Sequence, residues 1–175
     1  MKKRQEMYAN FLAQGEVEIL TSNEEKVTRM IVDGNLAYLQ LFSFSMLGLI
    51  LADNLLVLFC FWELVGVCSY FLIGFWFEQD EPPKASIKAF MTNRFGDVGF
   101  LIGILFCYRI FGTLDISAIY GRLQGFIADP ASFPPLFGWS MGALLTVTGL
   151  CLFMGPMAKS AQVPLHVWLP DAMAG

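Results

Sequence analysis

Long apolar runs alternate with short polar segments along most of the chain. The clearest run covers residues 54–77 and carries a single charged residue, Glu63, near its middle. An apolar run of this length without helix breakers is long enough to cross a bilayer as an α-helix. A carboxylate at the centre of such a helix costs about 2.5 kcal/mol or more, so it requires a partner or a water-filled path. The pattern therefore predicts a functional site around Glu63.

Further apolar runs lie before and after this one. Residues 36–52 form the first predicted span and join residues 54–77 as an antiparallel hairpin, through a polar turn at Asp53 and Asn54. The third predicted span covers residues 85–111 and carries Arg94 and Asp97. Because these two charged residues are three apart, they share a helix face and can pair.

The fourth predicted span begins near Gly138 and is interrupted. Gly155-Pro156, Pro164 and Pro170 fall in its second half, where proline removes or disfavours helical hydrogen bonds. Lys159 lies inside this broken region. Interrupted helices are tolerated at membrane depth where they line a cavity, and they are a sequence signal for ion sites.

The loop between the third and fourth spans, residues 112–137, contains the pattern of a short interfacial helix. Either Asp115 or Ser117 can cap its start, and prolines at 130, 134 and 135 close the loop. Apolar residues at helical spacing form the predicted membrane-facing side: Ile116, Ile119, Tyr120, Leu123 and Ile127.

The pattern predicts an all-α membrane protein. Only helices and closed barrels satisfy their backbone in lipid, and unbroken apolar runs contradict the alternation of a barrel strand. We expect a bundle of about four transmembrane helices, the last one interrupted, plus a short interfacial helix. Residues 1–35 form a polar cytoplasmic or interfacial segment, and residues 36–175 a truncated transmembrane domain. Basic residues place the N-terminus in the cytoplasm: Lys2, Lys3, Arg4, Lys26, Arg29, Lys84 and Lys88 face Arg109 and Arg122 across the membrane.

Composition agrees with this class and excludes several functions. The chain is 56% hydrophobic and 15% aromatic, with a mean hydropathy of +0.58. Its single histidine rules out a bis-histidine haem within the chain, and its 4 cysteines lack metal-type spacing and are expected to be packing residues. Without a cysteine cluster or a glycine-rich nucleotide loop, we expect neither a cofactor nor a metal in this chain.

Counting along the helices places the buried charges at similar depth. Glu63 lies roughly 14 Å from the start of its helix, and Arg94 and Asp97 roughly 14 and 18 Å from the opposite face. With Lys159 they form a set that sums to zero charge. Counted straight from Gly138, however, Lys159 would lie roughly 30 Å along its helix, near the far face. The sequence leaves open whether the break returns it to mid-depth.

Each charged residue also has a structural explanation. Glu63 could join two helices by hydrogen bonds, the pair of Arg94 and Asp97 could orient two helices, and Lys159 could extend its amine to an interface. His166, between two prolines, is either a loop residue or a candidate proton relay. Asp171 is expected to cap a following helix.

The motifs FWELVGVCSYFLIGFW (61–76), KAFMTNRFGDVGF (88–100) and KSAQVPLHVWLPDAMAG (159–175) carry a family resemblance. In this order they resemble the antiporter-like, proton-pumping membrane subunit of NADH:quinone oxidoreductase (complex I), of the subunit 5 or chain L type. The resemblance covers residues 36–175 and implies a fragment of a larger bundle. Gly155-Pro156 departs from the small non-proline residues expected before Lys159.

The resemblance implies roles and partners. Glu63 corresponds to the family's essential glutamate, Lys159 to its lysine on the discontinuous helix, and Arg94 and Asp97 to its paired charges. FMN, iron–sulfur clusters and quinone would belong to partner subunits in a bacterial plasma membrane or an equivalent energy-transducing membrane. Three alternatives stay open: the large subunit of a multisubunit sodium/proton antiporter, a subunit of a membrane-bound hydrogenase, and an inert structural fragment.

Overall fold

The computed structural model describes residues 17–77, 80–133 and 138–173, with side chains from residue 34 onward. The chain divides into two compact units, residues 1–38 and 39–175. Of the predicted polar segment, residues 1–16 lie outside the described residues, and the remainder is helical. The candidate site residues predicted from the sequence all lie in the second unit.

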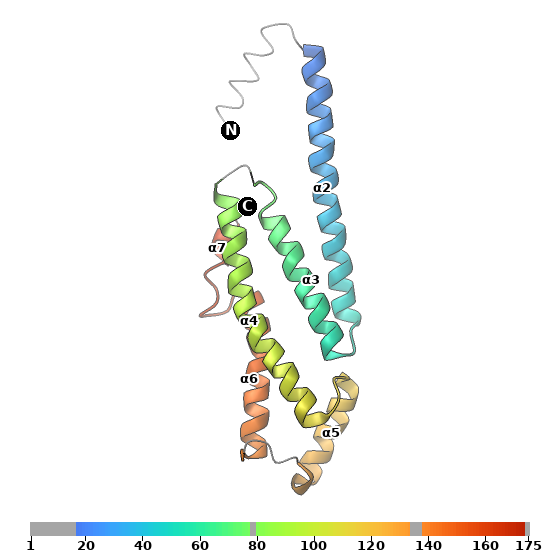
Figure 1. Ribbon diagram of the computed structural model, residues 1–175, viewed down its shortest axis with the longest axis vertical. Coiled ribbons are helices and arrows are strands. Elements are labelled where there is room, and N and C mark those ends of the chain that lie inside the picture. Colours follow the sequence, from blue (N-terminus) through green and yellow to red (C-terminus); the bar gives the residue numbers. More distant parts are fainter. Residues whose placement is uncertain (1–16, 78–79, 134–137, 174–175) are drawn as a thin grey trace. The chain divides into compact units, whose positions relative to one another are not determined.

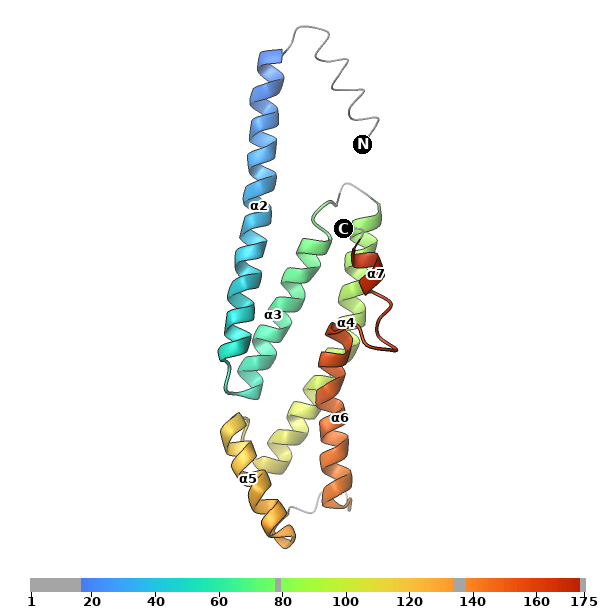
Figure 2. The ribbon, with the colours of Figure 1, turned by 180° about the vertical axis from the view of Figure 1, so that it is seen from behind.

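The described residues are almost entirely helical, as Figures 1 and 2 show. Among them, 3 helices have an apolar stretch long enough to cross a membrane. They are α2, within Gly34–Leu51, α3 and α6. The helix α4, which corresponds to the third predicted span, lies outside this set, so its role as a span stays a prediction. The elements are α2 (Val17–Leu51), α3 (Leu55–Ile73), α4 (Glu81–Phe111), α5 (Ile116–Ala128), the 3₁₀ helix η1 (Pro130–Ser132), α6 (Met141–Lys159) and α7 (Leu169–Ala172).

The turn between α2 and α3 forms where the sequence predicts it. The side chain of Asn54 caps α3 by accepting a hydrogen bond from the Leu56 N–H at 2.9 Å. Residues 39–51 of α2 then pack against α3 as a hairpin, with the Phe44 and Phe61 rings edge to face at 5.9 Å. The Ser45 hydroxyl lies 4.0 Å from the Cys68 sulfur in the same contact.

The helix α4 begins earlier than predicted, at Glu81, because Pro82 fits the first helical turn. It ends at Gly112, whose φ of 64° is left-handed and whose N–H bonds to the Tyr108 carbonyl at 2.8 Å. The guanidinium of Arg122 on α5 donates to the Phe111 carbonyl, which satisfies another group at this helix end.

Backbone hydrogen bonds join the α2–α3 turn to the α4–α5 turn. The Leu55 N–H donates to the Leu114 carbonyl at 2.8 Å, and the Ile116 N–H donates to the Asp53 carbonyl at 2.9 Å. Asp115 caps α5, as predicted, by accepting from the Ala118 N–H at 2.9 Å. The start of α3 and the end of α4 are therefore fixed to each other through backbone groups.

The predicted apolar side of α5 is divided. Ile119 and Leu123 pack on a core formed by Cys107, Ile110, Phe111 and Leu144. Tyr120 and Ile127 are both 63% exposed. The predicted prolines 134 and 135 lie outside the described residues. Thus α5 covers the end of the bundle with part of the side predicted to face the membrane.

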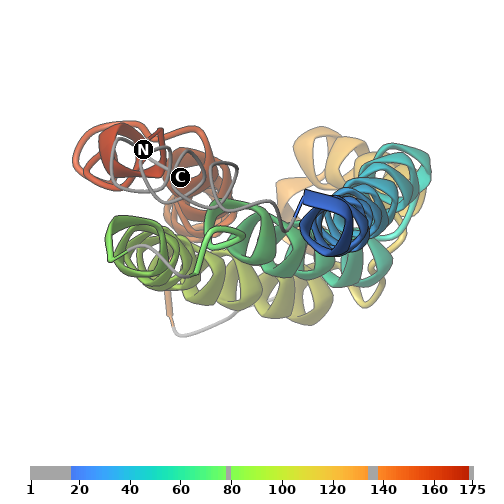
Figure 3. The same ribbon diagram turned by 90° about the horizontal axis from the view of Figure 1, so that it is seen from above.

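The helix α6 packs against α4, and Figure 3 shows α6 and α7, in orange to red, beside α4 in green. The predicted break at Gly155-Pro156 is wrong, since α6 passes through Pro156 and ends at Lys159. Gly155 allows this close packing, because a Cβ there would lie 2.9 Å from the Phe100 Cβ. The interruption falls instead between Lys159 and Leu169.

Polar contacts hold the segment after the break. The Trp168 indole N–H donates to the Ala158 carbonyl at 3.0 Å, near the C-terminal end of α6. Lys88 on α4 pairs with Asp171 on α7 at 2.5 Å. Asp171 lies inside α7 and joins it to α4, so its expected role as the cap of a following helix stays a prediction.

Candidate functional site

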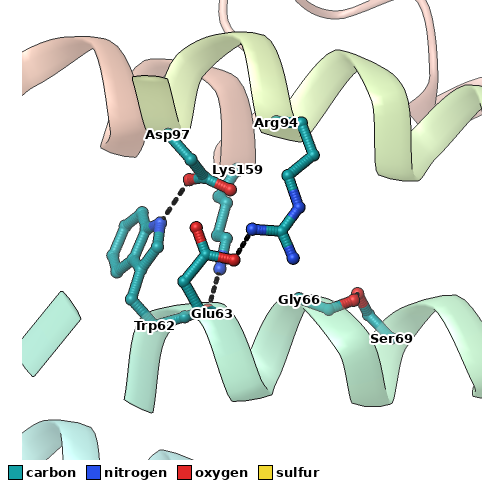
Figure 4. A network of polar contacts seen from close by, with 7 residues as sticks. All are labelled: Trp62, Glu63, Gly66, Ser69, Arg94, Asp97 and Lys159. Carbon is teal, nitrogen blue, oxygen red and sulfur yellow. Dashed lines mark hydrogen bonds and ion pairs between the residues drawn. The ribbon is translucent and has the colours of Figure 1, made fainter. Parts of the chain in front are cut away.

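The predicted charged residues converge on the middle of α3. Figure 4 shows Glu63 on α3, Arg94 and Asp97 on α4, and Lys159 at the end of α6 reaching the same stretch of helix. Because α3 and α4 are antiparallel neighbours, equal depths counted from opposite ends bring their charges level. The level predicted for Glu63, Arg94 and Asp97 agrees with this arrangement.

Glu63 forms an ion pair with Arg94 across the α3–α4 interface. The side chains of Arg94 and Glu63 are 35% and 21% exposed, respectively. The guanidinium of Arg94 also lies 4.6 Å from the centre of the Phe90 ring. Arg94 is therefore held by a carboxylate on a facing helix rather than by Asp97 on its own helix.

Asp97 is 4% exposed, which makes it the most buried of these charged residues. Its carboxylate accepts a hydrogen bond of 2.6 Å from the indole N–H of Trp62. A carboxylate buried in this way requires a donor or a counter-charge, and Trp62 supplies the donor.

Lys159 reaches α3 at Trp62. Its ammonium donates to the Trp62 backbone carbonyl and lies 4.4 Å from the centre of the same residue's ring. Gly66, one turn further along α3, lies beside it: a Cβ there would be in ordinary contact, 3.5 Å from the Lys159 nitrogen. The ammonium is thus bound by a carbonyl and an aromatic face.

Helix packing explains why Lys159 lies at this depth. Gly96 of α4 packs directly against Ala158, the residue before Lys159. Since Gly96 and Asp97 are level with the middle of α3, the end of α6 is brought to that level too. The lysine therefore reaches the other charges from the C-terminal end of α6, where the helix stops.

The pairing of Arg94 with Asp97 considered from the sequence is not formed among the described residues. Arg94 binds Glu63 and Asp97 binds Trp62, so both residues reach across to α3 instead of pairing along α4. Glu63 and Trp62 lie level with them on the facing helix and supply these partners. Trp62, which joins Asp97 to Lys159, was missed from the sequence. Its only signals were its place beside Glu63 and one turn before Gly66.

Other predicted residues lie apart from this group. His166 is exposed in the segment after the break, so its relay role stays a prediction. Of the cysteines, Cys68 and Cys107 are buried, whereas Cys60 is exposed. Across the described residues, no group of three or more His, Cys, Asp or Glu side chains could hold a metal ion. The carboxamide oxygen of Asn93, one turn before Asp97, is buried without a hydrogen-bond partner in this part of the chain.

Residues 52–175 match the family model described as NADH:quinone oxidoreductase/Mrp antiporter, transmembrane. This match covers well over half of the 175-residue chain. The chain belongs to this family. The description of the family names a transmembrane segment, which confirms the prediction of an integral protein of an energy-transducing membrane. The helices of the described residues confirm the predicted all-helical fold.

Relatives within the family are similar over most of this chain. Chain 5 of the NAD(P)H-quinone oxidoreductase of Synechocystis sp. is 50% identical over 139 residues, covering 79% of this chain and 19% of that protein. Subunit 5 of the Paulinella chromatophora organellar chromatophore enzyme is 53% identical over 138 residues, covering 79% and 20%. The chain therefore spans about a fifth of the length of these relatives.

A solved structure shows the same fold. A chain of the Mrp complex from Dietzia sp. DQ12-45-1b is 32% identical and superposes with a TM-score of 0.64, over 78% of this chain and 13% of that chain. The likeness to the oxidoreductase subunits matches the family resemblance drawn from the sequence, and the likeness to the Mrp complex matches its first alternative, the antiporter subunit.

Proposed function

We propose that this chain is part of the proton-translocating subunit 5 of an NAD(P)H-quinone oxidoreductase. In this proposal it works with other membrane subunits in the bilayer, and quinone reduction on partner subunits drives protons through it. FMN, iron–sulfur clusters and quinone would bind to those partners. The higher identity to the oxidoreductase subunits than to the Mrp chain supports this choice.

The charge group at the middle of α3 is the observation that carries the proposal. Glu63, Arg94, Asp97 and Lys159 sum to zero when all are ionised, so the group compensates itself in an apolar bundle. Removing or adding one proton leaves an uncompensated charge, which favours transfer of a proton onward rather than its storage. The group is therefore suited to passing protons.

Lys159 is the best candidate for the group that gives and takes the proton. It is held by a carbonyl and a ring rather than by a direct carboxylate bridge, so losing its proton breaks no close ion pair. It also lies where α6 ends, and interrupted helices at membrane depth line hydrated cavities. Glu63 and Arg94 would act on it through a shift of α3.

Asn93 supports a hydrated path beside this group. Its buried oxygen is an acceptor one turn from Asp97, and buried acceptors in proteins are normally satisfied by protein groups or ordered water. A proton-carrying water at this oxygen would extend the charge group by one turn of α4.

The decisive experiment compares proton transport with quinone reduction in the full-length protein within its complex. Lys159→Met should leave quinone reduction measurable and lower the protons moved per quinone by about tenfold or more, because the group that carries the proton is gone. Glu63→Gln should act in the same direction. The gradient is read with a pH-sensitive dye in sealed membrane vesicles.

Lys88→Met is the matched control, because Lys88 lies on α4 in a pair whose side chains are about half exposed. It should keep the wild-type ratio of protons to quinone. Normal transport by the Lys159→Met variant would end the proposal.

Sodium transport of the Mrp type is the second candidate, favoured by the 32% identity to a chain of an Mrp complex. The same vesicles distinguish the two ions. If removing sodium abolishes the gradient while quinone reduction continues, the sodium function replaces the proton function.

A further inference from the structure

Trp62 contacts both a buried carboxylate and a partly buried ammonium. Its indole N–H donates to Asp97 at 2.6 Å, and its ring centre lies 4.4 Å from the Lys159 nitrogen. Its backbone carbonyl accepts a hydrogen bond from the same ammonium. One residue of α3 thus joins a charged group of α4 to a charged group of α6, as Figure 4 shows.

The ring of Trp62 is fixed by its surroundings. It packs edge to face on Phe100, with ring centres 5.3 Å apart and planes at 64°. Phe100 is itself 5% exposed and lies against Gly155 of α6. The indole therefore has a defined orientation, with its N–H toward Asp97 and its face toward Lys159.

The two sides of the indole bind different charges. An aromatic face attracts a cation, whereas the polarised N–H at the ring edge donates to an anion. Binding of Lys159 to the face therefore requires the protonated amine, because a neutral amine has no charge for the ring to attract. The hydrogen bond to Asp97 does not depend on that proton.

We propose that Trp62 is a positioning residue that keeps Asp97 and Lys159 at a fixed separation while the lysine is protonated and holds the lysine more weakly when it is neutral. This inference rests on the proposed function, because it assigns the lysine a proton to carry. The lysine would be held at Trp62 by the ring and the carbonyl in its charged form, and by the carbonyl alone after deprotonation, when it can turn toward the next group of the path more easily. Asp97 stays bound to the indole throughout.

The test replaces single atoms of Trp62 in the full-length protein within its complex. Fluorinated tryptophans inserted at position 62 weaken the negative ring face step by step and keep the shape and the N–H. Protons moved per quinone should fall with each added fluorine, reaching about tenfold for the most fluorinated ring, because the attraction of the ring for the ammonium weakens step by step. A residue that only fills space would show no such gradation.

A benzothiophene analogue of tryptophan tests the other contact, because it keeps the ring and lacks the N–H. It should lower the ratio of protons to quinone by about tenfold. This loss should disappear when Asp97 is already replaced by leucine, since no carboxylate then remains for the indole to hold. Fluorination at Trp76, which is 45% exposed at the end of the hairpin, is the matched control and should change nothing.

The Lys159→Met variant in the same vesicles separates the two claims. If it stops transport but all the Trp62 analogues pump like the wild type, Trp62 has no positioning role and the proposed function stands. If Lys159→Met pumps normally, the proposed function fails and the role of Trp62 fails with it. Equal losses from every analogue, regardless of fluorine number, also overturn the inference.

Discussion

The two interfaces of α4 are built from different kinds of residue. Toward α6, α4 presents Gly96, Gly99 and Gly103, and the backbones approach closely: a Cβ at Gly103 would lie 2.6 Å from the Leu152 nitrogen. Toward α3, α4 presents long charged and aromatic side chains, among them Arg94 and Phe100. Small residues that bring helix backbones together are typical of packing in membranes.

This difference separates a fixed contact from an adjustable one. Backbones in van der Waals contact have little freedom to slide, because any shift drives atoms into one another. Long side chains can follow a displaced helix by changing rotamer, and ion pairs and hydrogen bonds can exchange partners. We therefore expect α4 and α6 to behave as one body, against which α3 adjusts through the ion pair of Glu63 and Arg94.

The largest expected effect comes from breaking the fixed contact. In Gly96→Leu, the new side chain would have to fit against Ala158. Its Cβ would lie 2.7 Å from the Met154 carbonyl oxygen. Overpacking of this kind costs about 3 kcal/mol or more when backbone must shift. The full-length protein should unfold at lower temperature in detergent or fail to accumulate in the membrane.

Gly149→Leu is the control, because a Cβ at that glycine of α6 meets nothing within 4 Å. It should match or exceed the wild-type stability, since leucine favours helices over glycine. Equal damage from both variants would show that the glycines matter for helix formation and not for the α4–α6 contact.

A double-mutant cycle on Glu63 and Arg94 tests whether their ion pair holds the adjustable interface between α3 and α4. Glu63→Gln or Arg94→Gln alone leaves one charge without its partner, which should lower the free energy of unfolding by about 1–2 kcal/mol because the pair is partly exposed. The double variant should cost less than the sum of the two. Denaturant or thermal unfolding in detergent measures the difference.

Arg109→Gln serves as the control for this cycle, because Arg109 is an exposed charge on the last turn of α4. Combined with Glu63→Gln, it should give an additive loss. An additive result for Glu63 and Arg94 would mean that the pair does not hold α3 to α4. The α3–α4 interface could then not be described as a contact held by an adjustable ion pair.

The sequence predicted the helices and the level of most charges for clear physical reasons. Apolar length fixed the spans, Asn54 and Asp115 supplied cap chemistry, and counting at the helical rise brought Glu63 level with Arg94. These features depend on local sequence, so they can be read without knowing which helices touch.

The partners within the charge group could not be predicted in the same way. Whether Lys159 binds Glu63 or Trp62 depends on how α6 packs on α4, which the glycines at 96, 99 and 103 decide through contacts far along the chain. Likewise, Pro156 breaks helices in isolation, but tertiary packing against Phe100 keeps α6 continuous to Lys159.

The smallest expected effect is a pH dependence at one end of the α3–α4 interface, where backbone hydrogen bonds join the α2–α3 turn to the α4–α5 turn. There Asp115 accepts from the Ser117 hydroxyl at 2.7 Å and from the Ala118 N–H. These bonds, that of Ser117 first, hold the pKa of Asp115 below its ordinary value, outside the membrane-spanning helices. A carboxylate whose pKa is lowered by folding stabilises the fold above its unfolded pKa of about 3.9 and loses that contribution as the pH falls through its folded pKa.

Protection of the Ala118 amide from hydrogen exchange measures this cap directly. We expect protection to be constant above about pH 4 and to decrease below it, as protonation weakens the acceptor at the start of α5. In Asp115→Asn the amide oxygen can still cap the helix but cannot titrate, so protection should become insensitive to acid. If acid loosened Ala118 equally in both proteins, another group would hold this end of the interface, and α3 would be free to move along its whole length rather than to pivot about the turn at Asp53.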